Sequence, residues 1–247
     1  MVISAVIPAR LASTRLPRKV LAEINGRPLI WYVWQQVARA GVFDEIIVAT
    51  DSTEVYAAVG SWGGQAFMTD PGCRSGTERI VSILPALRGD LVINVQGDEP
   101  LIDPGMLQML VISSEQGEWD ILTAVYRITD LESLQNPNLV KVARTSQGRA
   151  LYFSRSIIPY IRDHPLRDWL ERQSFWGHIG VYGYRRAVLE AYPHLPASTL
   201  ETAESLEQLR FLEAGYRIQT IQTDYHPVAV DTLADLEQVR QILGQQR

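Results

Sequence analysis

The first half of the chain alternates short apolar runs with segments of helical periodicity, and this alternation restricts the possible folds more than any other feature. Apolar runs of strand type occupy residues 2–7, 45–50, 65–69 and 91–96. Each is followed by a helical pattern, over residues 28–40, 53–61, 76–87 and 104–114. Strands that alternate with helices form parallel sheets covered by those helices. We therefore expect an open, mostly parallel α/β sheet over residues 1–118.

The second half of the sequence has a different pattern, which indicates an antiparallel lobe inserted into that sheet. Strands are predicted over residues 120–128, 139–146, 149–156, 178–184, 218–223 and 228–230. A Ser-Gln-Gly turn joins the second and third of these strands as a hairpin. Residues 157–176 contain two prolines and many charges, which predicts a long loop or lid. Amphipathic helices are expected over residues 204–215 and 232–243, the second with Thr232 as its N-cap.

Charge and composition exclude several classes of protein. The formal net charge of -5 and the pI of about 5.4 argue against a protein that coats nucleic acid. Cys73 is the single cysteine, so the chain has no internal disulfide framework. No apolar run approaches the roughly 20 residues that span a bilayer, and the first residues do not resemble a signal peptide. These features predict a soluble cytoplasmic protein that binds neither nucleic acid nor membrane.

Residues 7–19, with the sequence IPARLASTRLPRK, place four cations directly behind the first apolar run. Arg10, Arg15, Arg18 and Lys19 have no acid among them. The Walker and dinucleotide-binding glycine motifs are absent, although the small residues 12–14 would let backbone amides approach a ligand. Arginine forks and a lysine ammonium together hold polyphosphates. The residues alone leave two interpretations open, a phosphate-binding loop and a solvated basic turn that caps the next helix.

Other polar clusters follow predicted strands or open predicted helices. Asp98 follows a buried strand in NVQGDEP, and Asp231 follows a short apolar run in AVDTLADL, so both could bind a hard cation. Ser75 precedes a helix whose amino end could hold an anion. Turn formation, the helix dipole and ordinary capping explain the same residues without a ligand. Because ligands bind outside the carboxyl ends of parallel strands, we expect the basic loop, Asp51 and Asp98 to form one site.

A further group of polar residues comes from the second half of the chain. His178 and Tyr182 lie on one face of a predicted strand, and Glu207 and Gln208 lie on a predicted helix. A lone histidine on a strand is more often structural than catalytic, and the zinc motif H-E-x-x-H is absent. The G-x-S-x-G motif is also absent, and Cys73 has no marked histidine partner, so nucleophilic catalysis is disfavoured.

Nine motifs in order across nearly the whole chain resemble those of the 3-deoxy-manno-octulosonate (Kdo) cytidylyltransferase family. They are IPARLASTRLPRKVLAEINGRPLI, IIVATD, SGTER, NVQGDEPLI, NPNLVKV, ALYFSRSIIPY, HIGVYGYR, SLEQLR and VDTLADLE. The sialic acid cytidylyltransferases share the general plan of this family, but their first loop is richer in glycine and lacks the ASTRLP pattern.

The resemblance implies a nucleotide-diphospho-sugar transferase-like (Rossmann-like) fold, a homodimer, dependence on Mg²⁺, and the reaction of CTP with Kdo to give CMP-Kdo and pyrophosphate for lipopolysaccharide synthesis. It implies one domain over residues 1–247, with a nucleotide-binding half (1–118), a sugar-binding and dimerisation lobe (119–225) and a closing segment with the metal-site aspartate and a helix (226–247).

The resemblance also implies roles for individual residues. The nucleotide would be held by Arg10, Ser13, Arg15, Lys19 and Ser75. The metal would be held by Asp98 and Asp231. The sugar would be held by Arg15, Arg79, Gln96, His178, Tyr182, Glu207 and Gln208. The catalytic residues would be Asp98, Lys19 and Arg15.

The chain departs from the family pattern at three positions. The family commonly has Gly and Pro where this chain has Arg18 and Val20, so Arg18 is the loop cation that we expect to matter least for phosphate binding. The family often has Arg where this chain has Gly177. The alternative acceptor is therefore a related acidic sugar, an 8-amino Kdo analogue or sialic acid. The alternatives from other classes are a nucleotide-sugar sensor without catalytic activity and, less favoured by the acidic pI, an RNA-binding module.

Overall fold

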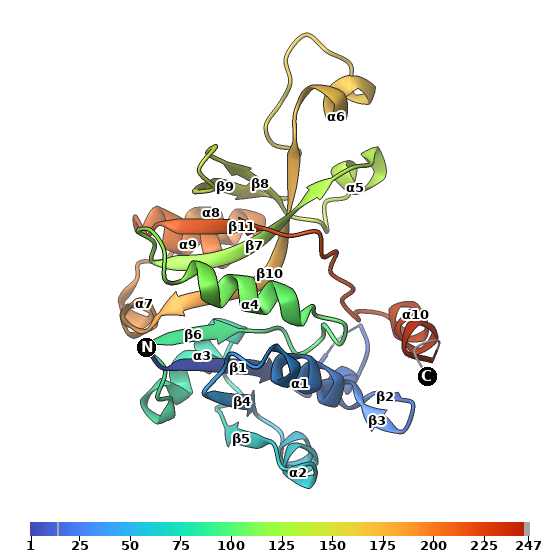
Figure 1. The fold of residues 1–247 in the computed structure, drawn as a ribbon, viewed down its shortest axis with the longest axis vertical. Coiled ribbons are helices and arrows are strands. Elements are labelled where there is room, and N and C mark those ends of the chain that lie inside the picture. Colours follow the sequence, from blue (N-terminus) through green and yellow to red (C-terminus); the bar gives the residue numbers. More distant parts are fainter. Residues whose placement is uncertain (14, 245–247) are drawn as a thin grey trace.

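The structure, a computed structural model, describes residues 1–13 and 15–244. Most of its β-strands form one sheet (Figure 1). Thr14 of the basic loop and residues 245–247 lie outside the described residues. The strands of the main sheet are β1 (Ile3–Ala9), β4 (Glu45–Thr50), β5 (Gln65–Met68), β6 (Leu91–Asn94), β7 (Ile121–Ile128), β8 (Lys141–Arg144), β9 (Ala150–Ser154), β10 (Phe175–Arg185) and β11 (Ile218–Gln222). A small separate hairpin contains β2 (Glu23–Ile24) and β3 (Arg27–Pro28).

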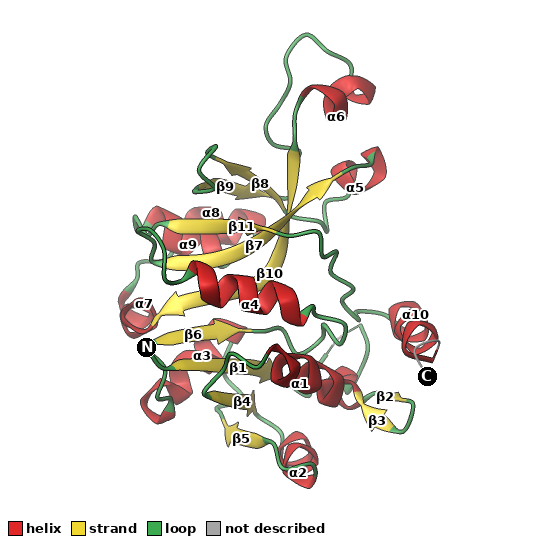
Figure 2. Cartoon of the chain, viewed as in Figure 1, coloured by secondary structure: helices red, strands yellow, loops and turns green. Residues whose placement is uncertain are grey.

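Most helices connect these strands, whereas α10 (Leu233–Gly244) follows the last strand and lies to one side of the sheet (Figure 2). The helices are α1 (Leu29–Ala40), α2 (Thr53–Ser61), α3 (Gly76–Ile83), α4 (Pro104–Ser113), α5 (Leu131–Gln135), α6 (Trp169–Arg172), α7 (Arg186–Ala191), α8 (Thr199–Glu204), α9 (Gln208–Glu213) and α10. Short 3-10 turns are η1 (Lys19–Leu21), η2 (Leu84–Ala86), η3 (Leu166–Asp168) and η4 (Tyr192–His194). No helix among the described residues is long and apolar enough to cross a membrane.

The predicted parallel half of the sheet is confirmed. The strand order is β11-β7-β10-β6-β1-β4-β5, and β1 pairs in parallel with both β4 and β6, while β4 pairs in parallel with β5. These four strands therefore end at one edge of the sheet, and the basic loop, Asp51 and Asp98 follow three of them. Alternation of strand and helix in the sequence thus places the three polar segments together.

Local sequence explains where helices begin and end in the parallel half. Pro28 precedes α1, and Gly41 ends it in the left-handed region at φ 66°, which suits a residue without Cβ. Ser52 and Ser75 cap α2 and α3, because each hydroxyl accepts a hydrogen bond from a backbone amide in the first turn. The apolar face of α1, which includes Leu29 and Val33, is fully buried. Burial of one such side chain contributes about 2 kcal/mol.

The second half supplies predicted antiparallel strands, but its strand β11 pairs in parallel with β7. β10 pairs antiparallel with β6 and β7, and β8 pairs antiparallel with β9 as a hairpin. Gly148 in the hairpin turn has φ 88°, and a Cβ added there would lie 2.9 Å from the carbonyl oxygen of Thr220 on β11. The turn therefore packs closely against β11, and glycine meets both the backbone conformation and the space.

Three predictions about the second half are wrong in part. The helix expected over residues 204–215 is broken, because Ser205 takes the left-handed conformation (φ 53°) and separates α8 from α9. Residues 228–230 form no strand, and the amide of Val230 donates instead to the carbonyl oxygen of Asp98 at 2.9 Å. The expected loop at 157–176 contains η3 and α6, and β10 already begins at Phe175 (Figure 1).

Candidate active site

A cleft of about 300 Å³ lies at the carboxyl ends of the parallel strands, and it gathers most of the residues that the sequence predicts for the site. Its lining is Pro8, Arg10, Ala12, Ser13, Arg15, Lys19, Val20, Cys73, Arg74, Ser75, Gly76, Arg79, Gln96, Gly97, Asp98, Glu207 and Asp231. Arg18, the remaining cation of the basic loop, is not among the described residues that line the cleft. The cleft therefore combines cations from the basic loop with two aspartates that are far apart in the sequence.

Lys19 lies between these two aspartates. Its Nζ is 2.6 Å from Oδ2 of Asp98 and 2.9 Å from Oδ1 of Asp231, and its side chain is only 12% exposed. Burial alone would lower the pKa of Lys19, but the charges of the two carboxylates and their hydrogen bonds outweigh it and raise the pKa. Arg15 adds a second cation 3.0 Å from Oδ1 of Asp231. The two carboxylates thus converge on one cation, as ligands of a shared metal ion would.

Backbone contacts hold the two aspartates in place. The hydrogen bond from Val230 to the carbonyl of Asp98 joins the two segments directly beside the carboxylates. Asp235 in the first turn of α10 accepts from the amides of Asp231 and Thr232, at 3.0 and 2.7 Å. Thr232 Oγ1 in turn accepts from the amide of Asp235, which agrees with its predicted capping role. The start of α10 therefore fixes Asp231, although no strand precedes it.

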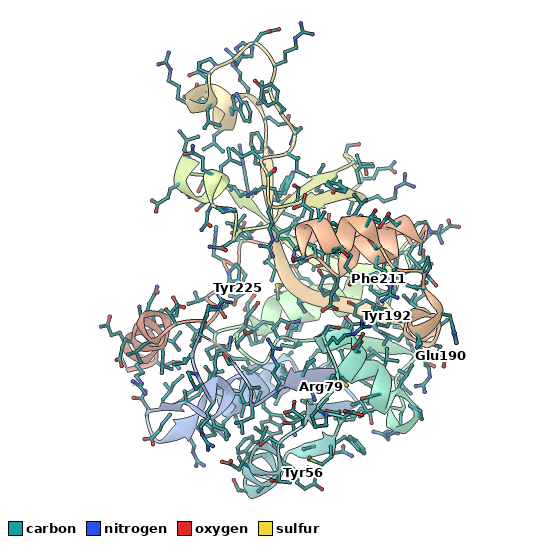
Figure 3. The ribbon with its side chains drawn as sticks, turned by 180° about the vertical axis from the view of Figure 1, so that it is seen from behind. Tyr56, Arg79, Glu190, Tyr192, Phe211 and Tyr225 are labelled. Carbon is teal, nitrogen blue, oxygen red and sulfur yellow. The ribbon has the colours of Figure 1, made fainter. Side chains whose placement is uncertain are left out.

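Asp51 connects the basic loop to Arg79. Its Oδ1 accepts from the amide of Leu11 at 3.3 Å, and its Oδ2 is 2.9 Å from Nη2 of Arg79. Arg79 is 3% exposed and also donates a hydrogen bond to the hydroxyl of Thr69. Its side chain lies in the parallel half of the molecule (Figure 3). Such a buried ion pair orients both side chains, and breaking it would leave an unpaired charge inside the protein.

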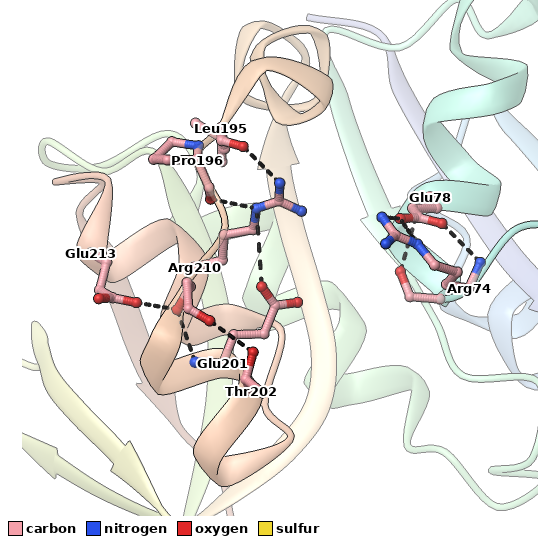
Figure 4. A network of polar contacts seen from close by, with 10 residues as sticks. Arg74, Glu78, Leu195, Pro196, Glu201, Thr202, Arg210 and Glu213 are labelled. Carbon is pink, nitrogen blue, oxygen red and sulfur yellow. Dashed lines mark hydrogen bonds and ion pairs between the residues drawn. The ribbon is translucent and has the colours of Figure 1, made fainter.

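Ser75 and Glu207 bring the second half of the chain to the cleft. Ser75 and Glu207 both line the cleft, and burial raises the pKa of the Glu207 carboxyl group. A neighbouring pocket of about 500 Å³ shares Ser75 and Glu207 with the cleft. Figure 4 shows the charged pairs on its two sides, with Arg74 and Glu78 facing Arg210 and Glu201.

Tyr182 and Gln208 lie in an adjoining pocket rather than in the cleft itself. This pocket has a volume of about 210 Å³ and shares Gln96 and Glu207 with the cleft. The two pockets therefore adjoin at these shared residues. Tyr184, which also lines it, stacks on Tyr182 with ring centroids 5.6 Å apart.

His178 is not among the described residues that line either pocket. Its ring packs against Phe153 and Tyr182, each with centroids 5.2 Å away, and its Nε2 is 3.0 Å from Oγ1 of Thr123. The Thr123 hydroxyl lies 2.7 Å from the carbonyl of Val181 and donates there, so it accepts from Nε2–H of His178. Burial lowers the pKa of His178 to about 3, so the ring is neutral at physiological pH.

Gly177 is explained by the strand that lies opposite it. It pairs with Tyr126 across β10 and β7, and a Cβ added to Gly177 would lie 2.6 Å from the Tyr126 ring. The same ring packs edge-on against His226, with centroids 4.6 Å apart. A larger residue at 177 would displace Tyr126, so the absence of a side chain at this position is linked to the presence of the tyrosine.

Glu99 was not predicted as a site residue, although its pKa is raised more than that of the other acids around the cleft. Glu99 is 6% exposed, and its Oε2 has no hydrogen-bond partner among the residues that the structure describes. Burial, with a smaller contribution from the charge of Asp98, raises the pKa of Glu99 to about 8. The sequence Gly-Asp-Glu-Pro reads as a turn, and nothing in it distinguishes the buried acid from the one that faces the cleft.

The substitution Glu99→Gln should make the free energy of unfolding less dependent on pH between pH 5 and 8. The pKa of Glu99 is about 8 in the folded protein and near 4.5 in the unfolded chain, so the folded state holds the proton more tightly. The free energy of unfolding therefore falls as pH rises between these values. Between pH 5 and 8, we expect the wild type to lose about 3 kcal/mol relative to the variant.

Urea unfolding of both proteins at pH 5, 6.5 and 8 measures this difference. The exposed Glu171→Gln is the matched control, and its difference from the wild type should stay constant with pH. A constant difference for Glu99→Gln as well would show that Glu99 is ionised in the folded protein throughout this range.

The cleft and the fold can be compared with known proteins. A family model described as cytidylyltransferase matches residues 4–219. The 3-deoxy-manno-octulosonate cytidylyltransferase of Geotalea uraniireducens is 43% identical over 97% of this chain and 98% of its own length. That of Myxococcus xanthus is 44% identical over 97% of this chain and 95% of its own.

Solved structures give the same result. A CMP:2-keto-3-deoxy-manno-octonic acid synthetase in complex with CTP superposes with a TM-score of 0.93, at 39% identity over 100% of both chains. A 4-diphosphocytidyl-2C-methyl-D-erythritol synthase from Anaerococcus prevotii is 16% identical, with a TM-score of 0.66 over 100% of this chain and 99% of its own, which shows likeness of fold alone.

Proposed function

The chain belongs to the 3-deoxy-manno-octulosonate cytidylyltransferase family, and on this premise we propose that it transfers the cytidylyl group of CTP to Kdo and releases pyrophosphate. The observation that carries this proposal is the convergence of the basic loop with Asp98 and Asp231 in one cleft. A cleft that contains several cations and two acids suits a triphosphate with a hard cation.

The reaction brings two anions together, so positioning and charge must provide most of the catalysis. The anomeric hydroxyl of Kdo attacks the α-phosphorus of CTP, the bond from this phosphorus to the bridging oxygen of pyrophosphate breaks, and the hydroxyl proton leaves to solvent. Arg10, Arg15 and Lys19 bind phosphate oxygens and offset the charge that develops on pyrophosphate. Ser75, at the amino end of α3, orients the nucleotide beside them.

The residues present fit Mg²⁺, because Asp98 and Asp231 already share one cation, the Lys19 ammonium. We propose that these two carboxylates hold the ion together with phosphate oxygens of CTP. Bound Mg²⁺ would neutralise phosphate charge and lower the pKa of the attacking hydroxyl. Lys19 then serves as a phosphate ligand and ceases to be the partner of the two acids.

The sugar is proposed to occupy the adjoining pocket. Gln96, Glu207 and Gln208 present polar side chains there, with Tyr182 as one wall. Arg15 and Arg79 lie in the neighbouring cleft, where they can meet the sugar carboxylate. His178 contributes through its contact with Tyr182.

We also propose that the protein is a cytoplasmic homodimer whose product is used for lipopolysaccharide synthesis. The resemblance to the family supports these points, and light scattering of the purified protein tests the dimer.

A pyrophosphate-release assay tests the proposed function. Each of the four nucleoside triphosphates is combined with Kdo, 8-amino Kdo or sialic acid, with Mg²⁺ and with a chelator. We expect release with CTP, Kdo and Mg²⁺ to exceed every other combination by at least about a hundredfold. Preference for UTP, or activity that ignores the sugar, would overturn the proposal, and greater activity with another acidic sugar would reassign the acceptor. Binding of CTP without release in any combination would identify a sensor.

A further inference from the structure

The phosphate loop, defined here as residues 10–19, makes polar contacts near both of its ends with the segment that leads from β4 into the first turn of α2. Near its start, the amide of Leu11 donates to Asp51. Near its end, Arg18 forms an ion pair with Glu54 in the first turn of α2. The residues between these two contacts include Arg15, which reaches Asp231. These two contacts join the described ends of the loop to the residues that directly follow β4.

Arg18 makes the second of these contacts with its whole guanidinium group. Nη1 donates to Oε1 of Glu54 at 3.1 Å, and Nη2 donates to Oε2 of the same carboxylate. This is the two-bond arrangement that fixes the relative orientation of an arginine and a carboxylate. Arg18 and Glu54 line another pocket, together with Asp51, and neither of them lines the cleft that contains Asp98.

The backbone of Arg18 is also unusual. It lies in the left-handed region (φ 58°, ψ 28°), which costs free energy for a residue with a side chain. Its carbonyl accepts from the amide of Leu21 at 2.9 Å, so this conformation begins the η1 turn. The next residue is Lys19, whose ammonium lies between Asp98 and Asp231. The direction of the Lys19 side chain therefore depends on the conformation of Arg18.

We propose that the Arg18–Glu54 ion pair is a clasp that positions Lys19 for the triphosphate of CTP. Arg18 and Glu54 are positioning residues, since neither lines the cleft. This inference rests on the proposed function, because CTP is the ligand whose binding the clasp would improve.

The exposure of the pair supports a role in positioning over one in stability. The Arg18 and Glu54 side chains are 57% and 51% exposed. Ion pairs at such exposure contribute little to the stability of a protein, and salt weakens them. The clasp should therefore influence where Lys19 lies while leaving the thermal unfolding temperature almost unchanged.

Three variants test the clasp: Glu54→Gln, Arg18→Glu, and the charge-swapped double variant Arg18→Glu/Glu54→Arg. The dissociation constant for CTP with Mg²⁺ is measured by calorimetry at low and at high salt, and the unfolding temperature by calorimetric scanning. At low salt, we expect Glu54→Gln to weaken CTP binding about three- to fivefold and Arg18→Glu to weaken it further. The double variant should recover to within about twofold of the wild type, because the ion pair is restored in reverse.

High salt supplies a second readout. Since salt screens exposed charges, the ratio between the dissociation constants of Glu54→Gln and the wild type should approach one at about 1 M salt. The matched control is Glu118→Gln, which removes an ion pair to Arg217 that lies outside the lining of the cleft and is also exposed. It should leave CTP binding unchanged at both salt concentrations.

Two results would overturn the inference. If Arg18 bound phosphate directly, Glu54→Gln would leave CTP binding unchanged or tighten it, and the charge swap would not restore it. If the pair did not position Lys19, the single variants would leave the dissociation constant for CTP unchanged, whatever their unfolding temperature. Failure of the proposed function is distinguishable, because wild-type protein would then release no pyrophosphate from CTP and Kdo whatever its affinity for CTP.

Discussion

The substitution Asp98→Asn should lower kcat for pyrophosphate release at least about a hundredfold while the protein stays folded. Asp98 supplies one of the two carboxylates that converge on Lys19, and an amide in its place carries no charge to hold a metal ion. The fold should persist, because the contact that joins this segment to Val230 uses the backbone carbonyl of residue 98, which the substitution keeps. We expect the free energy of unfolding to change by less than about 1 kcal/mol.

Steady-state kinetics with CTP, Kdo and Mg²⁺, together with urea unfolding, measure these two quantities. The matched control is Asp163→Asn, another exchange of an acid for its amide. Asp163 is exposed and has φ 62°, a left-handed conformation that asparagine accepts well. This control should retain the wild-type kcat. A purified, folded Asp98→Asn variant with a near-normal rate would remove Asp98 from the proposed metal site.

The position of the site was predictable because it depends on topology. The apolar runs at residues 2–7, 45–50 and 91–96 become β1, β4 and β6, and their parallel pairing places Asp51, Asp98 and the basic loop at one edge. The spacing of apolar residues and the positions of turn residues indicate which strands form. Polar residues after a strand indicate that its carboxyl end belongs to the candidate site.

Contacts between distant segments were not predictable in the same way. A helix over 204–215 satisfies the apolar periodicity, and only tertiary packing places Ser205 in the left-handed conformation that divides it. The apolar residues 228–230 look like a strand, but their backbone serves to join Asp231 to Asp98. Such choices depend on what the rest of the chain brings alongside, and a single sequence does not contain that information in any local pattern.

The choice of cation in the cleft shows the same limit. The sequence contains 23 lysines and arginines, and only Lys19 and Lys141 are lysines. Lys141 is fully buried, and its Nζ donates to the carbonyl oxygens of Asn136, Leu139 and Arg155. In both places a compact ammonium with three donors meets several oxygens at once, which the planar arginine fork does less well. The sequence names the two residues, but only the structure shows that each is surrounded by acceptors.

The substitution Lys19→Met should change catalysis and metal binding in opposite directions. Methionine keeps the length of the side chain and removes its charge, so the triphosphate loses a ligand and kcat/KM should fall about a hundredfold. In the protein without nucleotide, the ammonium of Lys19 contacts Asp98 and Asp231 and would compete there with the proposed metal ion. Its removal should therefore increase the affinity for Mg²⁺ about tenfold, since one positive charge within hydrogen-bond distance has been taken away.

Calorimetric titration of nucleotide-free protein with Mg²⁺ and steady-state kinetics test the two effects separately. Lys19→Arg is the control, because it keeps the charge and changes only its shape, so its affinity for Mg²⁺ should stay within about twofold of the wild type. Equal affinities for Mg²⁺ in the wild type and Lys19→Met would mean that the two aspartates do not share a metal ion. Tighter Mg²⁺ binding with unchanged kcat/KM would instead limit Lys19 to a partner of the acids in the free protein. The proposed reaction requires that Lys19 leaves the two carboxylates and binds phosphate when CTP and Mg²⁺ are present. Only tighter Mg²⁺ binding together with slower turnover in Lys19→Met supports this exchange of partners.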